Sequence, residues 1–254
     1  MKIYNLFIAE LTRFFVEIKR YYFETLSGLI VFYLIFISMF YGIRSFGGAD
    51  FGTDRLDVLI AGYIMWTVAV MGFQVVSNSI YEETQRGTLE QIFLCSLGVE
   101  MPLILSTVIH TFFAVMISTL MLFLTMLTTG RWLYIDPTGI LGVLALSLPS
   151  LWGIGLIIGS LTIVYKKIAS LLQIFIFLLI AIVAVNAYPL NLFTFLPFAS
   201  GATTIRLIMT QQVNFSVSWY LTIFVINYAY LFAGIVVFKM IEKSARRKNL
   251  LSQY

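Results

Sequence analysis

Six long apolar stretches, separated by short segments that hold nearly all of the charge, constrain this chain more than any other feature. A helix needs about 20 apolar residues to cross the hydrocarbon core of a bilayer, whereas a barrel strand needs about 10 residues of alternating polarity. Hydrophobic residues make up 60% of the chain and charged residues 11%. Soluble domains hold about 45–50% and about 25% of these classes. We therefore predict an all-α integral membrane protein.

The apolar stretches predict a single transmembrane domain over residues 1–254. A bundle over 27–238 is followed by a basic tail, 239–254. In the fourth span Gly155 and Gly159 form a G-x-x-x-G pair, which permits close approach of a neighbouring helix. We place the six spans at 27–43, 56–80, 103–129, 138–165, 168–188 and 217–238.

The distribution of basic residues predicts the orientation. Twelve of the 16 Lys and Arg residues lie before the first span, after the second, after the fourth and in the tail, and the other four lie in the alternate segments. Cytoplasmic segments carry the excess of Lys and Arg. We therefore expect a multi-pass protein of the cell (inner or plasma) membrane with both termini in the cytoplasm.

The segment before the first span, 1–24, is predicted to form an amphipathic helix at the membrane surface. Its charged residues alternate in sign and form either a solvated face or a surface for a cytoplasmic partner. Neighbouring charges can also form ion pairs along the helix. The apolar residues are Tyr4, Phe7, Ile8, Leu11, Phe14, Phe15, Ile18 and Tyr22, and the charged ones are Glu10, Arg13, Glu17, Arg20 and Glu24.

The stretch YEETQRGTLEQIFLCSLG follows the second predicted span and contains signals for a helix stop and a new helix start. Gly87 is a natural stop because glycine adopts the left-handed conformation at low cost. Thr88 and Gln91 have the spacing of a capping box. Glu90 lies in the first turn, where the helix dipole favours a negative charge. A short helix is therefore predicted over 88–97.

This short helix has one apolar face, formed by Leu89, Ile92 and Phe93. A segment that only joined two spans would need neither the caps nor this face. Two interpretations remain. The helix either rests on lipid as an interfacial reversal or inserts into a groove of a soluble partner, where anchors at i, i+3 and i+4 are typical.

The string EETQRGTLEQIFLCSLG resembles the cytoplasmic loop of the permeases of type-2 ATP-binding cassette (ABC) exporters, in which such a stretch follows the second span and forms the coupling helix. The arm, the six spans and the chain length are similar as well. The chain departs from the family at CSLG, where a proline is common. The resemblance is carried by Glu82, Glu83, Arg86, Gly87, Thr88, Leu89 and Glu90, and it implies that these residues, with Ile92 and Phe93, contact the ATPase.

The resemblance implies a permease subunit that pairs with a second permease chain, identical or similar, and binds two ATPase subunits. ATP and Mg²⁺ would be held by the ATPase, so this chain would carry no cofactor and no catalytic residue. The sequence agrees in one respect, because it has no G-x-x-x-x-G-K-[ST] phosphate loop. The resemblance also implies export of a drug, lipid, glycan or peptide, and no nucleic-acid partner is expected.

The segment 189–216 is apolar but too interrupted for a continuous span, because it contains Pro189, Pro197 and Gly201. We predict one or two short helices that enter the outer leaflet and return, buried against protein. The alternative is an external interfacial helix. FLPFASGATTIRLIM also resembles the segment between spans five and six of the exporter family, which implies an outer gate that includes Pro197, Gly201 and Arg206.

Other function classes lack the residues that they need. His110 is the one acidic or basic residue predicted deep in a span. It is either a functional group or, as we favour, a neutral imidazole that can hydrogen-bond to a neighbouring helix. A proton- or sodium-coupled carrier is disfavoured because no carboxylate is predicted deep inside a span, and Asp57 lies at the very end of one. An enzyme is disfavoured because the spans hold no paired carboxylates, no His–acid constellation and no nucleophile together with a base. The remaining alternative is a membrane-embedded assembly or regulatory protein that docks a cytoplasmic partner without transport.

Overall fold

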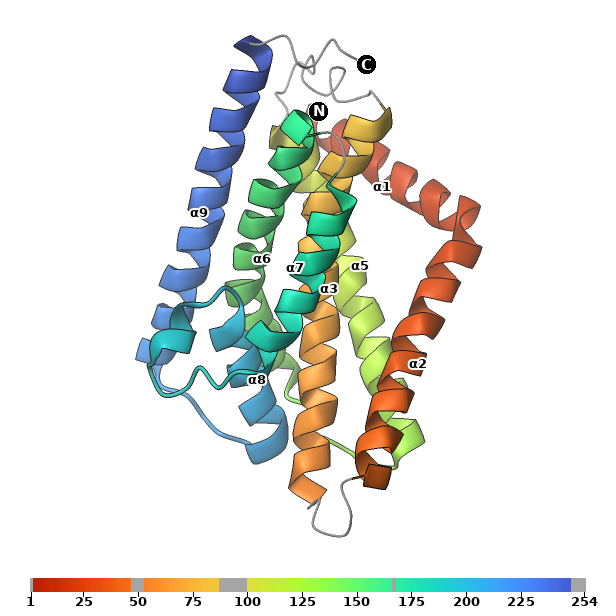
Figure 1. The fold of residues 1–254 in the computed structure, drawn as a ribbon, viewed down its shortest axis with the longest axis vertical. Coiled ribbons are helices and arrows are strands. Elements are labelled where there is room, and N and C mark those ends of the chain that lie inside the picture. The colour runs from red at the N-terminus through yellow and green to blue at the C-terminus, as the bar shows by residue number, and fades with distance from the viewer. Residues whose placement is uncertain (1, 47–52, 87–99, 166–167, 248–254) are drawn as a thin grey trace.

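The computed structural model describes residues 2–46, 53–86, 100–165 and 168–247, and these ranges contain helices and connecting segments but no strand. The all-α prediction is therefore confirmed for the described part of the chain (Figure 1). The elements are α1 (Lys2–Arg20), α2 (Tyr22–Phe46), α3 (Thr53–Arg86), α5 (Glu100–Thr129), α6 (Pro137–Tyr165), α7 (Ala169–Ala184), the 3₁₀ helix η1 (Leu192–Phe195), α8 (Ala199–Gln211) and α9 (Val217–Arg247).

Five of the described helices are long and apolar enough to cross a membrane, as expected for a membrane-embedded protein. Each contains at least 24 residues, or about 36 Å at 1.5 Å per residue, against a hydrocarbon core of about 30 Å. These spans are Tyr22–Ser45, Arg55–Gln85, Pro102–Thr129, Pro137–Tyr165 and Val217–Ala245.

The predicted fifth span, 168–188, is shorter than the sequence suggests. Its helix, α7, has 16 residues and a length of about 24 Å. It ends because Val185 has an extended backbone (φ −66°, ψ 153°). Six continuous spanning helices are therefore not found in the described ranges. The prediction of one or two short helices over 189–216 is confirmed, since η1 and α8 follow in this segment.

Helix α6 lies at the centre of the packing, against α3, α8 and α9. Its small residues bring the neighbouring backbones close. A Cβ atom on Gly155 would lie 3.1 Å from the carbonyl oxygen of Phe73 in α3, and one on Gly159 would lie 2.9 Å from Ile80 Cδ1. The predicted close approach at the G-x-x-x-G pair is thereby confirmed, and its partner is α3.

Helix α1 lies at an angle to α2 and crosses the end of the bundle, where it packs against α5 (Figure 1). The bend between α1 and α2 is at Tyr21, so the amphipathic helix ends before residue 24. At the same end of the molecule lie the C-terminal ends of α3 and α9. Helix α9 continues to Arg247, so the first part of the predicted basic tail is helical.

Candidate functional site

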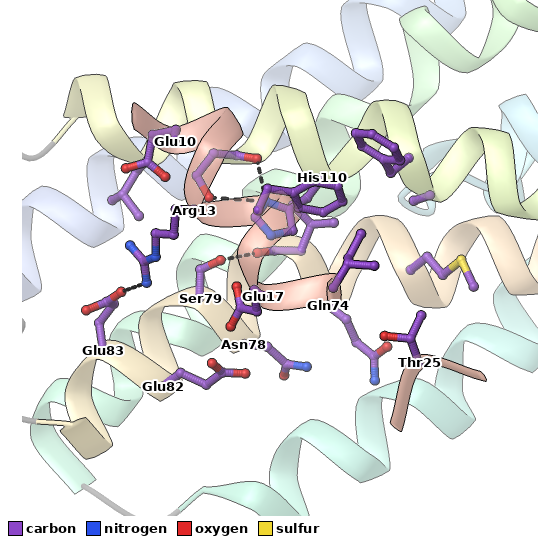
Figure 2. A pocket seen from close by; sticks show the side chains of 18 of the residues that line it. Glu10, Arg13, Glu17, Thr25, Gln74, Asn78, Ser79, Glu82, Glu83 and His110 are labelled. Atoms are coloured by element: carbon purple, nitrogen blue, oxygen red, sulfur yellow. Dashed lines mark hydrogen bonds and ion pairs between the residues drawn. The ribbon is translucent and has the colours of Figure 1, made fainter. Parts of the chain in front are cut away.

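A polar cavity of about 400 Å³ lies where α1 crosses α3 and α5. Figure 2 shows charged and amide side chains from α1 and α3 around it, with His110 from α5. In a chain with 11% charged residues, such a concentration of polar groups is unusual. Since intramembrane and interfacial polar clusters have a desolvation cost, this cavity is the leading candidate for a functional site.

An ion pair connects α1 to the end of α3. Arg13 donates a hydrogen bond from Nη2 to Oε1 of Glu83, across 70 positions of sequence (Figure 2). Glu83 is only 8% exposed, whereas the Arg13 side chain is half-exposed. A buried carboxylate requires a charged or hydrogen-bonding partner, which Arg13 provides. The hydrogen bond to Glu83 in turn raises the pKa of Arg13 above its ordinary value.

Glu10 lies one helical turn before Arg13 and lines the same cavity. Burial raises the pKa of Glu10 above its ordinary value of 4.5, and the nearby charges of Arg13 and His110 oppose this shift. The folded protein therefore favours the protonated carboxyl. The contribution of Glu10 to stability is present below pH 4.5 and is lost as the pH rises through the raised pKa.

Aromatic contacts hold α1 on α5. Phe14 is buried, and its ring lies edge-on to His110 with centroids 4.8 Å apart. Its centroid is 4.3 Å from that of Phe113. Aromatic pairs in such geometries contribute about 0.5–1.5 kcal/mol beyond their buried area. Phe14 and Arg13 are neighbours, so one turn of α1 provides both the apolar and the ionic contact with the bundle.

The imidazole of His110 is oriented by its own helix. Its Nδ1 lies 2.8 Å from the carbonyl oxygen of Ser106 and 3.2 Å from the hydroxyl of the same residue. A carbonyl oxygen only accepts hydrogen bonds, so Nδ1 carries the proton in this contact. The hydrogen bonds of Nδ1 thus stay within α5 rather than reach a neighbouring helix, and among the described residues His110 meets another helix through its aromatic contact with Phe14 of α1.

Two of the predicted coupling residues, Glu82 and Glu83, lie on the last turns of α3 and line the cavity. Arg86 is the last residue of α3. The rest of the predicted coupling set, Gly87, Thr88, Leu89, Glu90, Ile92 and Phe93, lies outside the described residues and remains a prediction. Among the described residues, no three His, Cys, Asp or Glu side chains are grouped so as to hold a metal ion.

The three predicted gate residues lie in the segment after α7, with Pro197 just before α8 and Gly201 and Arg206 within α8. Pro197 and Gly201 are buried, and a Cβ atom on Gly201 would lie 2.3 Å from Cβ of Ser147 in α6. Arg206 donates hydrogen bonds to the carbonyl oxygens of Val183, Ala184 and Val185 at 3.2, 3.3 and 3.1 Å. These oxygens end α7, where a positive charge also stabilises the helix dipole.

Sequence reasoning missed the polar residues of α9 that hold this segment. The Oδ1 atom of Asn227 accepts a hydrogen bond from the backbone N–H of Phe198 at 3.1 Å, and the indole N–H of Trp219 donates to Oγ1 of Thr204 at 2.8 Å. Asn227 is fully buried. An asparagine within an apolar run was a usable signal, because such a residue needs a partner inside the membrane.

Comparison with known proteins adds no family assignment. No protein-family model matches the chain, and a search of curated proteins finds no matching relative.

Proposed function

We propose that this chain is the membrane subunit of an ATP-driven exporter and that the cavity between α1, α3 and α5 lies at its contact with a separate ATPase. The observation that carries the proposal is the ion pair of Arg13 with Glu83. It joins the surface helix to the end of α3, directly before the predicted coupling helix 88–97. A force applied to that helix would act on α1 and α3 together.

Helix α3 is suited to pass such a displacement into the membrane. It is one continuous helix of 34 residues, from Thr53 to Arg86. Its buried residues Phe73, Val76 and Ile80, in the half nearer to Arg86, pack on α6 at Gly155 and Gly159. Close-packed helices shift as units rather than deform continuously, so a movement at the Arg86 end is transmitted along the helix.

In this proposal the chain is a multi-pass protein of the cell membrane with both termini in the cytoplasm. Helix α7 enters from the cytoplasmic side, and the short helices η1 and α8 complete the sixth crossing as a re-entrant external segment. Irregular backbone at membrane depth requires internal partners. The side chains of Thr203, Thr194 and Asn227 supply such partners to the backbone at Ala187 and Phe198.

The proposed complex contains a second permease chain and two ATPase subunits, and ATP and Mg²⁺ bind to the ATPase. The proposed external gate comprises Pro197, Gly201 and Arg206. The direction of transport comes from the resemblance to the exporter family. The neighbouring reading frame provides a first check, since the proposal expects it to encode a phosphate-loop ATPase.

A charge-swap experiment tests the coupling role. Arg13→Glu and Glu83→Arg should each weaken co-purification with the ATPase and its stimulation by cargo, because each places two like charges together. The double variant should recover both properties. Contacting residues couple by about 0.5–3 kcal/mol in double-mutant cycles, and we expect a value in this range.

The matched control is Arg20→Glu, a reversal at an exposed position of the same helix. This control should co-purify and couple like the parent. The proposal is lost if both single reversals insert, bind the ATPase and stimulate hydrolysis normally. Binding of a cytoplasmic partner without any cargo movement into vesicles would instead favour the assembly or regulatory function.

A further inference from the structure

A second cavity, at the opposite end of α3 from the polar site, has a different character. It is a groove of about 540 Å³ between α2, α3, α7 and α8, within the usual range of about 300–1,000 Å³ for ligand sites. Its wall is apolar and includes Ile35 and Met39 of α2, Val58 of α3 and Ile180 of α7. Ile35, Val58 and Ile180 are exposed, so the groove is open to whatever surrounds the helices.

Positive charge marks one end of this groove. Arg206 from α8 and Arg55 from the first turns of α3 both line it. Arg55 already has an interaction partner within the chain. We therefore take Arg206 as the residue whose charge is available to a ligand. The three hydrogen bonds of the Arg206 guanidinium go to neutral carbonyl oxygens, and no described carboxylate pairs with it. A guanidinium has five N–H donors, so donors and net charge remain.

We propose that this groove binds an anionic phospholipid of the surrounding bilayer. The acyl chain lies along the apolar wall, and the phosphate lies at Arg206. The combination of a long apolar wall with a cation at one end matches a lipid tail and its anionic headgroup, whereas a second protein helix would not require the charge. The groove shares Arg206 with the proposed external gate, but the lipid proposal does not rest on export, because a resident lipid need not be cargo.

Gly62 of α3 is a position from which a side chain can fill the groove. It lines the groove, and a Cβ atom at this position would meet no other atom within 4 Å. Gly62→Leu therefore places a side chain in open space and replaces a poor helix former with a good one. Gly28→Leu is the matched control, because Gly28 of α2 also has nothing within 4 Å and does not line the groove.

The fluorescence of Trp66 can report whether lipid occupies the groove. Its ring lines the groove, and its indole N–H lies 3.5 Å from the carbonyl oxygen of Ile176 in α7. The full chain is placed in nanodiscs that contain small mole fractions of brominated phosphatidylglycerol or brominated phosphatidylcholine. Bromine quenches nearby tryptophan fluorescence, and the signal of Trp66 is obtained as the difference between the parent and Trp66→Phe.

We expect half-maximal quenching of Trp66 at a mole fraction of phosphatidylglycerol about fivefold lower than that of phosphatidylcholine. One basic residue near an anionic lipid contributes about 1 kcal/mol, which corresponds to this ratio. Arg206→Gln should abolish this preference, and Arg44→Gln, which removes an exposed charge outside the groove, should preserve it. Gly62→Leu should reduce quenching by both lipids, and Gly28→Leu should not.

Three results would overturn the assignment. Equal quenching by both lipids in the parent would indicate ordinary annular lipid. Absence of quenching by either lipid would indicate that protein covers the groove, as in pairing with a second copy. Unchanged quenching in Gly62→Leu would show that the lipid lies elsewhere. The comparison of Gly62→Leu with the parent does not depend on Arg206. It therefore tests whether lipid occupies the groove even if Arg206→Gln fails to fold.

Discussion

Two glycines set the distance between α6 and α9. A Cβ atom on Gly153 would lie 2.3 Å from the carbonyl oxygen of Tyr230, and one on Gly234 would lie 2.3 Å from that of Gly153. In each case the obstacle is backbone, which cannot rotate away as a side chain can. Small residues at such crossings allow the backbones to make van der Waals contact in the absence of a hydrophobic driving force between helices.

Gly153→Ala should therefore separate the two helices and lower the free energy of unfolding. Overpacking of a close contact typically costs about 1–3 kcal/mol. Thermal unfolding in detergent micelles, followed by circular dichroism, measures the loss. Gly142→Ala, in the same helix with open space around the new atom, should be neutral or slightly stabilising. Equal melting temperatures for the two variants would contradict a tight crossing at Gly153.

At the scale of elements, the segment between α7 and α9, which includes η1 and α8, is anchored to α9 by side-chain hydrogen bonds. Phe198 has a left-handed backbone (φ 64°), which is uncommon for a non-glycine residue. Its N–H is bonded to Asn227, and α8 begins immediately afterwards at Ala199. Asn227 also donates to the carbonyl oxygen of Ile223 in its own helix, which fixes the orientation of the amide.

Asn227→Leu should loosen this segment because the buried N–H of Phe198 loses its acceptor. An unsatisfied buried donor costs about 1–3 kcal/mol. Hydrogen exchange measured by mass spectrometry should show faster exchange over 196–204, with little change in α3. Thr222→Val is the control on the same helix, since Thr222 bonds to Ser218 of α9 and to no other element among its described contacts. Identical exchange in both variants would mean that Asn227 does not hold the segment.

At the scale of the whole molecule, the orientation in the membrane is still a prediction from the basic residues. It places Cys95, the one cysteine of the chain, in the cytoplasm. A membrane-impermeant maleimide should leave Cys95 unlabelled in sealed right-side-out vesicles and should label it after lysis. Denatured protein serves as the control for accessibility. Labelling of intact vesicles would reverse the proposed topology.

The sequence by itself determined the class of the protein and most of its helices. Backbone groups in a bilayer must form their hydrogen bonds within the protein, and a long apolar stretch does so by forming a helix. The same reasoning located the amphipathic arm and predicted short helices over 189–216, since Pro189 and Pro197 interrupt the apolar run. These features depend on local composition and on the periodicity of a single segment.

The tertiary structure decided which faces meet and therefore what the sites contain. The pairing of Arg13 with Glu83, the crossing at Gly153 and the groove beside Gly62 each join elements that are distant in sequence. Spanning helices that are apolar on every face carry no stripe that identifies the inward side. The charges of α1 pointed to ion pairs within the helix, but burial of Glu83 made a partner from another helix necessary. The carbonyl oxygens at the end of α7 are likewise bound by Arg206, which comes from another element.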